Sequence, residues 1–148
     1  MRTLNILIAC ISFSALTLFL QSCCKQYCTD DTIFAVDFQG FQPTEIDKIL
    51  VLQYNPDNFT NAVDSYYVSS NNIIIKDTTR VYLDKPLAND FNFRINVEKA
   101  GLSYVLSDIQ TKKENCHCEN GTYDIITNYK LNGIQFQHRN GFPLEIKK

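Results

Sequence analysis

The chain has 148 residues, with 14 lysine and arginine residues, 16 aspartate and glutamate residues and a formal net charge of −2. This balance gives no basic face for nucleic acid and no polybasic patch for anionic lipid. The length corresponds to a single domain that is large enough to bury a hydrophobic core.

The first twenty residues are largely apolar. Met1-Arg2 precedes an apolar run from Leu4 to Leu20, and the first acidic residue is Asp30. A short positive start followed by an apolar run is typical of a secretory signal. The run is slightly shorter than the ~20 apolar residues of a spanning helix, and an uncleaved N-terminal anchor is the alternative interpretation.

The run ends in Leu20-Gln21-Ser22-Cys23, which resembles the lipobox of bacterial lipoproteins. In that pattern an aliphatic residue stands three positions before the lipid-bearing cysteine, and a small residue stands directly before it. Leu20 and Ser22 match, whereas Gln21 departs from the usual small or aliphatic residue. The resemblance implies cleavage before Cys23, lipid attachment to Cys23 and a location at the outer membrane of a Gram-negative cell envelope.

This resemblance divides the chain into three parts. We expect a signal peptide over residues 1–22, a lipidated polar tether over residues 23–31 and a folded domain over residues 32–148. Because the tether is short, the domain should sit close to the membrane surface.

The expected domain shows short apolar runs separated by turn residues. We expect strands over residues 32–38, 45–54, 62–68, 73–76, 79–83, 91–97, 102–111, 123–131, 134–138 and 144–146, with a polar loop over 112–120. Single helical turns fit residues 85–89 or 97–101. Asn132-Gly133 predicts a type I′ hairpin turn. This spacing favours an all-β antiparallel sandwich, Ig-like or transthyretin-like in its Greek-key topology.

The clearest alternation is FNFRINV over residues 91–97. Successive side chains of a strand point to opposite faces, so one set should be buried and the other exposed. We expect burial of the apolar set, Phe91, Phe93, Ile95 and Val97, and exposure of the polar set, Asn92, Arg94 and Asn96.

Four of the six cysteines remain once Cys10 leaves with the signal and Cys23 carries lipid. They are Cys24, Cys28, Cys116 and Cys118. An even number in an exported chain predicts disulfides. A bond between Cys116 and Cys118 would close a very tight ring, so we expect at least one bond between the N-terminal pair and the 116–118 pair.

A metal site is the competing interpretation of the cysteines. It would use Cys28, Cys116 and Cys118 with His117 or His138. A single Cys-x-Cys matches the C-x₂₋₄-C spacing of structural zinc sites poorly. We therefore expect no metal and no cofactor. His138 stands between Gln137 and Arg139 near an expected hairpin end, so we expect its side chain to be solvated.

Catalytic motifs are not visible in the sequence. Acidic residues pair at positions 30–31, 45 with 47, and 119 with 124. Two carboxyl groups can catalyse glycoside hydrolysis, so a hydrolase is one alternative function. Tyrosines in expected edge strands and loops could stack on a sugar or anchor a protein; they are Tyr54, Tyr66, Tyr67 and Tyr82. The absence of tryptophan weakens a sugar platform.

These features predict a binding module tethered to the membrane by its N-terminal lipid, with a protein or glycan partner and no nucleic acid. A structural or assembly factor of the envelope that acts through an edge strand is a further alternative.

Overall fold

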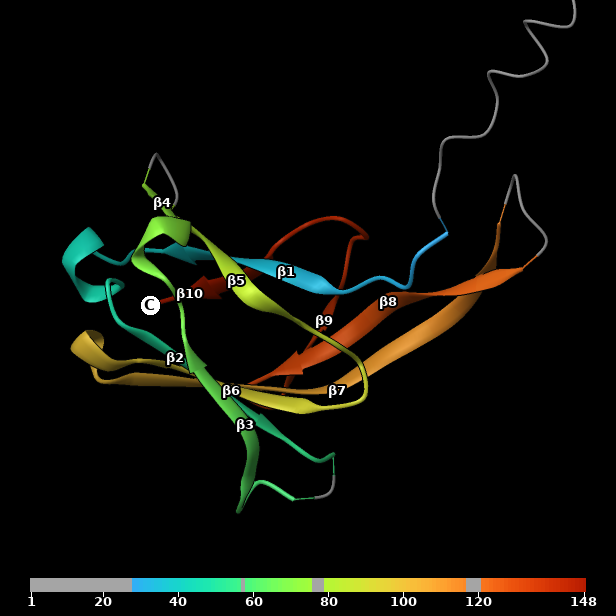
Figure 1. Cartoon of the computed structure of the whole chain (residues 1–148), viewed down its shortest axis with the longest axis horizontal. Helices are drawn as coiled ribbons and strands as arrows, with labels where there is room; N and C mark the ends of the chain where they lie inside the picture. The colour runs from blue at the N-terminus through green and yellow to red at the C-terminus, as the bar shows by residue number, and fades with distance from the viewer. Residues whose placement is uncertain (1–27, 57, 76–78, 117–120) are drawn as a thin grey trace, which may run out of the picture.

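The computed structural model describes residues 28–56, 58–75, 79–116 and 121–148. Over these residues the chain forms two β-sheets that pack face to face, with three short 3-10 turns and no α-helix (Figure 1). The strands are β1 (Ile33–Gln39), β2 (Ile49–Tyr54), β3 (Ala62–Tyr67), β4 (Ile73–Ile75), β5 (Thr79–Leu87), β6 (Asn92–Val97), β7 (Leu102–Asn115), β8 (Thr122–Leu131), β9 (Ile134–Gln137) and β10 (Leu144–Lys147). The turns are η1 (Pro43–Glu45), η2 (Ser70–Asn72) and η3 (Glu98–Ala100).

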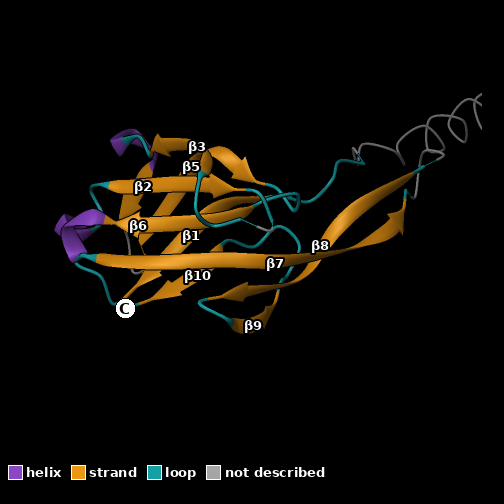
Figure 2. Ribbon diagram, turned by 90° about the horizontal axis from the view of Figure 1, so that it is seen from below, coloured by secondary structure: helices purple, strands orange, loops and turns teal. Residues whose placement is uncertain are grey.

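The two sheets differ in width. Among the described strands, the smaller sheet has the order β10-β1-β5-β4, and the larger sheet has the order β3-β2-β6-β7-β8-β9. In the view of Figure 2, β3 and β9 lie at the two edges of the larger sheet. β1 pairs with β10 in parallel, and the other described pairs are antiparallel. The predicted all-β sandwich is confirmed.

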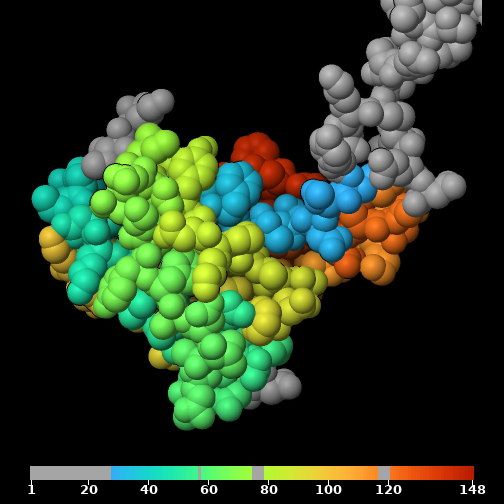
Figure 3. Space-filling view, viewed as in Figure 1, coloured from blue at the N-terminus to red at the C-terminus, as the bar shows by residue number. Residues whose placement is uncertain are grey.

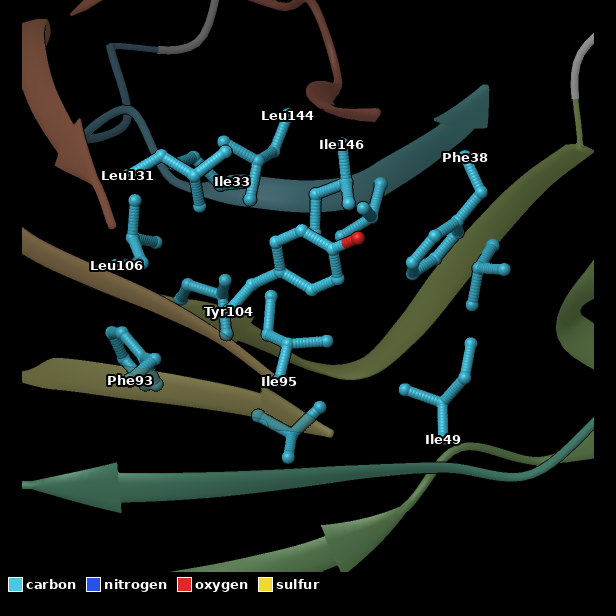
Figure 4. Packing of buried hydrophobic residues seen from close by; sticks show 14 of the residues in the cluster. Ile33, Phe38, Ile49, Phe93, Ile95, Tyr104, Leu106, Leu131, Leu144 and Ile146 are labelled. Carbon is cyan, nitrogen blue, oxygen red and sulfur yellow. The ribbon is translucent and has the colours of Figure 1, made fainter. Parts of the chain in front are cut away.

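The hydrophobic core fills the space between the inner faces of the two sheets (Figure 4). Phe93, Ile95 and Val97 of β6 are buried as predicted, and Phe91 packs against the core while partly exposed. The predicted exposure of Asn92 is wrong. Its side chain is buried, because its amide Nδ2 donates a 2.7 Å hydrogen bond to the carbonyl oxygen of Pro56.

Three strand boundaries differ by more than one residue from those expected. The strand expected from residue 45 begins at Ile49, because Glu45 ends η1 and accepts a hydrogen bond from the Gln42 N–H. β5 passes through Pro86 to Leu87, which pairs with Ile33. A proline is tolerated there because β4 does not extend along that part of β5, so no ladder bond is lost on that side.

The third boundary lies in the longest strand. The loop expected over residues 112–120 is wrong for its first part, because β7 continues to Asn115 and pairs there with Thr122 of β8. Lys113 Nζ lies 3.2 Å from Asp124 Oδ1, and this ion pair between β7 and β8 supports the extension. Asn132 and Gly133 both have positive φ, 51° and 80°, which confirms the predicted type I′ turn between β8 and β9.

The β7–β8 hairpin projects from one end of the sandwich, and the N-terminal described residues lie against it (Figures 1 and 3). A disulfide joins Cys28 to Cys116, with 5.9 Å between their Cα atoms and a sequence separation of 88. Next to it, the Asp124 N–H donates to Asp30 and the Asp31 N–H donates to the Asp124 carbonyl.

A bond between the N-terminal cysteines and the 116–118 pair is therefore confirmed. Cys24 and Cys118 lie outside the described residues. The last residues of the expected tether are held against β8 by backbone hydrogen bonds, so they form part of the folded unit.

Replacing Cys28 and Cys116 together by alanine should lower the free energy of unfolding by about 2–5 kcal/mol, because the bond closes a long loop in the unfolded chain. Urea denaturation of a non-lipidated mature chain measures this change. Non-reducing peptide mapping is the control, and free thiols at both positions, or one zinc ion bound per chain, would contradict the disulfide.

Candidate functional site

One edge of the larger sheet is not covered by the smaller sheet. A row of inward-facing side chains crosses the larger sheet from Phe93 through Leu106 and Leu131 to Ile134, each paired with the next. Their exposed fractions are 2%, 0%, 8% and 64%. The row is buried under the smaller sheet until it reaches β9, where the last side chain is open to solvent.

The next inward-facing position on β9 repeats this pattern. Phe136 pairs with the buried Tyr129 across β8 and β9, but its own side chain is 42% exposed. The two rings stack with centroids 5.8 Å apart and planes 20° apart. Stacking on Tyr129 fixes the orientation of the Phe136 ring and leaves its other face uncovered.

A cavity of about 550 Å³ lies along this uncovered surface, between β9, β10 and the 138–143 loop that joins them. We call it the β9–β10 groove. Its lining includes Tyr104, Tyr129, Phe136 and Phe142 and, from β10, Glu145 and Lys147. Its volume falls in the range of ligand sites, roughly 300–1,000 Å³.

Tyr104 forms the inner end of the groove. It rises from β7 between the two sheets, and its hydroxyl points toward the strand that carries Ile146 (Figure 4). The hydroxyl donates a 3.1 Å hydrogen bond to the carbonyl oxygen of Lys147. Burial raises the pKa of Tyr104 and of Tyr129, so both hydroxyls stay protonated near neutral pH.

A histidine and a carboxylate are buried together beside the groove. The side chains of His138 and Asp31 are 3% and 7% exposed, and His138 Nε2 lies 3.6 Å from Asp31 Oδ2. The predicted solvation of His138 is therefore wrong. The 138–143 loop begins there with the His138 N–H bonded to the Thr127 carbonyl, which turns the ring inward against Tyr129.

The opposite edge of the sandwich is closed by polar contacts. The Tyr66 hydroxyl on β3 donates to the Lys85 carbonyl at 2.8 Å, and Lys85 pairs with Asp64. Asp84 accepts hydrogen bonds from the Ser69 N–H and from Asn72. These bonds tie β3 and η2 to β5, so the two sheets are joined at this edge.

The four tyrosines proposed from the sequence lie away from the groove. Tyr54 is buried against Phe59 and Tyr66 is half-buried, and burial raises the pKa of Tyr66 to about 12. Tyr67 is exposed, but its hydroxyl donates to Glu98 at 2.9 Å. Tyr82 lies on the smaller sheet with its ring against Phe34. They do not form one surface.

The described members of the acid pairs have structural partners. Glu45 pairs with Lys148, Asp47 with Lys99 and Asp124 with Lys113. Asp30 and Asp31 both bind backbone N–H groups of β8. Glu119 lies outside the described residues.

Two further findings concern metals and membranes. In the part of the chain that the structure describes, no three histidine, cysteine or acidic side chains gather as a metal site, and Cys28 and Cys116 are paired with each other. The described residues also contain no helix of the length and apolarity that crossing a bilayer requires.

Sequence reasoning missed the groove, although β9 carries a signal for it. Ile134, Phe136 and His138 alternate with polar residues, which places all three on one face. The sequence gives no sign that the facing sheet stops at β10, and so the exposure of the first two could not be predicted.

The stability of the fold should depend on the protonation of His138. Burial lowers the pKa of His138 below its ordinary 6.5, with Asp31 acting in the opposite direction. The unfolded chain takes up a proton near pH 6.5 and the folded chain only at lower pH. The free energy of unfolding should therefore fall as the pH drops through 6.5 and level off below the folded pKa.

Urea denaturation at a series of pH values between 7.5 and 5 checks this expectation. His138→Gln should flatten the change between pH 7.5 and 5.5, where ordinary carboxyl groups do not titrate. An unchanged pH dependence in that variant would contradict the assignment.

No protein-family model matches this chain, and no match is found among curated proteins or solved structures. A functional assignment of the β9–β10 groove therefore depends on its shape, on its lining side chains and on the free strand edges beside it.

Proposed function

We propose that the mature chain is a lipid-anchored module of the bacterial cell envelope that binds a protein partner in the β9–β10 groove. The lipobox-like Leu20–Cys23 segment supports the anchor and the location. The single observation that carries the binding role is the exposure of inward-facing apolar side chains on β9 beside a cavity of about 550 Å³.

Apolar side chains exposed to water around the groove cost free energy. Ile134, Phe136 and Phe142 are 64%, 42% and 59% exposed, and they gather around one cavity. Clustered apolar exposure on a folded domain marks an interaction site, whereas single exposed apolar residues need no explanation. A partner that covers these side chains gains roughly 25 cal/mol for each Å² of apolar area removed from water.

The lining favours a protein over a glycan. Sugar sites present flat aromatic faces with many polar groups, but the Tyr129 ring is buried between Phe136 and His138. The chain also contains no tryptophan. Apolar side chains next to free strand edges suit a polypeptide better, because it can supply both apolar groups and backbone hydrogen bonds.

A role as an envelope assembly factor would use the same surface, since β9 and β10 are edge strands among the described residues. The hydrolase alternative gains no support from the described acids. His138 lines the groove, but its side chain is buried together with that of Asp31. The other described members of the predicted acid pairs hold lysines or backbone groups.

The lipid anchor is tested by replacing Cys23 with alanine in the full chain. Metabolic palmitate labelling should be lost and the precursor should remain uncleaved, because the acceptor thiol is gone. Cys24→Ala is the matched control and should keep the label. Labelling that persists in Cys23→Ala would overturn the anchor.

The binding role is tested by affinity capture of the full chain from native envelopes. Replacing Phe136 and Phe142 by serine should reduce recovery of a stoichiometric protein partner by about tenfold or more, because apolar anchors dominate binding energy. Phe34→Ser is the matched control, since Phe34 is 43% exposed on the smaller sheet. Equal recovery with all three forms would reject the groove as the binding site.

A further inference from the structure

We propose that the partner binds as an extended segment that pairs with the free edge of β10 and so adds a strand to the smaller sheet above β9. This inference rests on the proposed function and names the form of the partner. It is drawn from the backbone of β10 and from the side chains that the added strand would cover.

The backbone groups of β10 show which side of the strand is free. The Lys148 N–H donates to the Gln39 carbonyl, toward β1, at 3.1 Å. The neighbouring Lys147 carbonyl points the other way, where it accepts the Tyr104 hydroxyl. Backbone groups of successive residues point to opposite sides of a strand, so the N–H and C=O of Glu145 also face the open edge.

The side chains of β10 continue the pattern of the core. Leu144 and Ile146 are fully buried between the sheets, while Glu145 and Lys147 lie on the outer face. A strand paired beside β10 would alternate in the same way. Its inward side chains would lie over Ile134 and Phe136, and its outward side chains would lie beside Glu145 and Lys147.

The dimensions fit one strand. Paired strands lie about 4.8 Å apart and facing sheets about 10 Å apart. The larger sheet extends past β10 by the uncovered strand β9. One added strand would therefore cover the exposed row. The segment that pairs with β10 would be about four residues long, the length of β10.

Only an extended polypeptide meets both requirements of this site. The free edge of β10 needs alternating backbone donors and acceptors, and the uncovered face needs apolar side chains at every second position. A helix has free backbone groups only at its ends, and a glycan or an acyl chain has no such alternation. The partner segment should thus alternate apolar and polar residues.

The test places a photo-crosslinking benzoylphenylalanine at Phe136 of the full, lipidated chain in its native cells, with the same group at Phe34 as the matched control. The two positions are 42% and 43% exposed. We expect crosslinks from position 136 to one contiguous segment of a protein partner with alternating apolar residues, and no such crosslink from position 34.

Glu145→Pro tests the backbone pairing. It removes an N–H on the open edge without removing a bond to β1, which an edge strand tolerates. The crosslink yield from position 136 should fall at least tenfold, whereas Glu145→Ala should keep it. If thermal melting shows that Glu145→Pro does not fold, Ile134→Ser replaces it, since this change alters only an exposed side chain and should lower the yield severalfold.

The outcomes separate the two proposals. Crosslinks from position 136 to a second copy of this chain, to lipid alone or to glycan alone would overturn the strand, as would a yield insensitive to both substitutions. A protein partner crosslinked from position 34 but not from 136 would keep a protein-binding role but reject both the groove and the strand. Protein crosslinks at neither position would reject both.

Discussion

A β-sheet can bury its inner face only where a second layer lies over it. In this domain the smaller sheet has fewer strands than the larger one, and this difference decides which inner-face side chains are buried. Side chains of β2, β6, β7 and β8 meet the smaller sheet and form one core. The same row continues onto β9 with no layer above it. The stable core and the exposed apolar groove are thus two parts of one continuous surface.

The two edges of the sandwich differ in the side chains that they carry. At the β3 edge, Tyr66, Asp64 and Asp84 bond to neighbouring segments and join the sheets with polar contacts. Such exposed pairs contribute little stability individually, but they occupy the edge. At the β9 edge, apolar side chains lie beside β10, which is an edge strand among the described residues. That combination is what an incoming strand requires and what an isolated soluble domain usually avoids.

Local patterns in the sequence predicted much of the fold. Alternation placed Phe93, Ile95 and Val97 in the core, and Asn132-Gly133 fixed the β8–β9 turn. Partners distant in sequence were harder to predict. Burial of Asn92 depends on the Pro56 carbonyl. Burial of His138 depends on Asp31, which contacts it in space but lies near the opposite end of the domain in sequence.

The groove could not be predicted because it depends on strand order. Ile134 and Phe136 look like ordinary core residues in the sequence, and only the end of the smaller sheet at β10 leaves them exposed. The tyrosines proposed from the sequence are large and amphipathic, but the hydroxyls of Tyr66 and Tyr67 bond within the domain.

If the chain is anchored as we propose, the disulfide would also set how the domain stands on the membrane. With lipid on Cys23, as we propose, five residues link the acyl chains to Cys28 and span at most about 18 Å. Cys116 is bonded to Cys28, so the tip of the β7–β8 hairpin would be held just above the headgroups. The end with η1 and η3, opposite the β7–β8 hairpin, would then point away from the bilayer (Figure 1). The β9–β10 groove lies between these two ends. A partner strand would approach along the membrane plane, and reduction of the disulfide would leave that orientation to the hydrogen bonds that Asp30 and Asp31 make with β8.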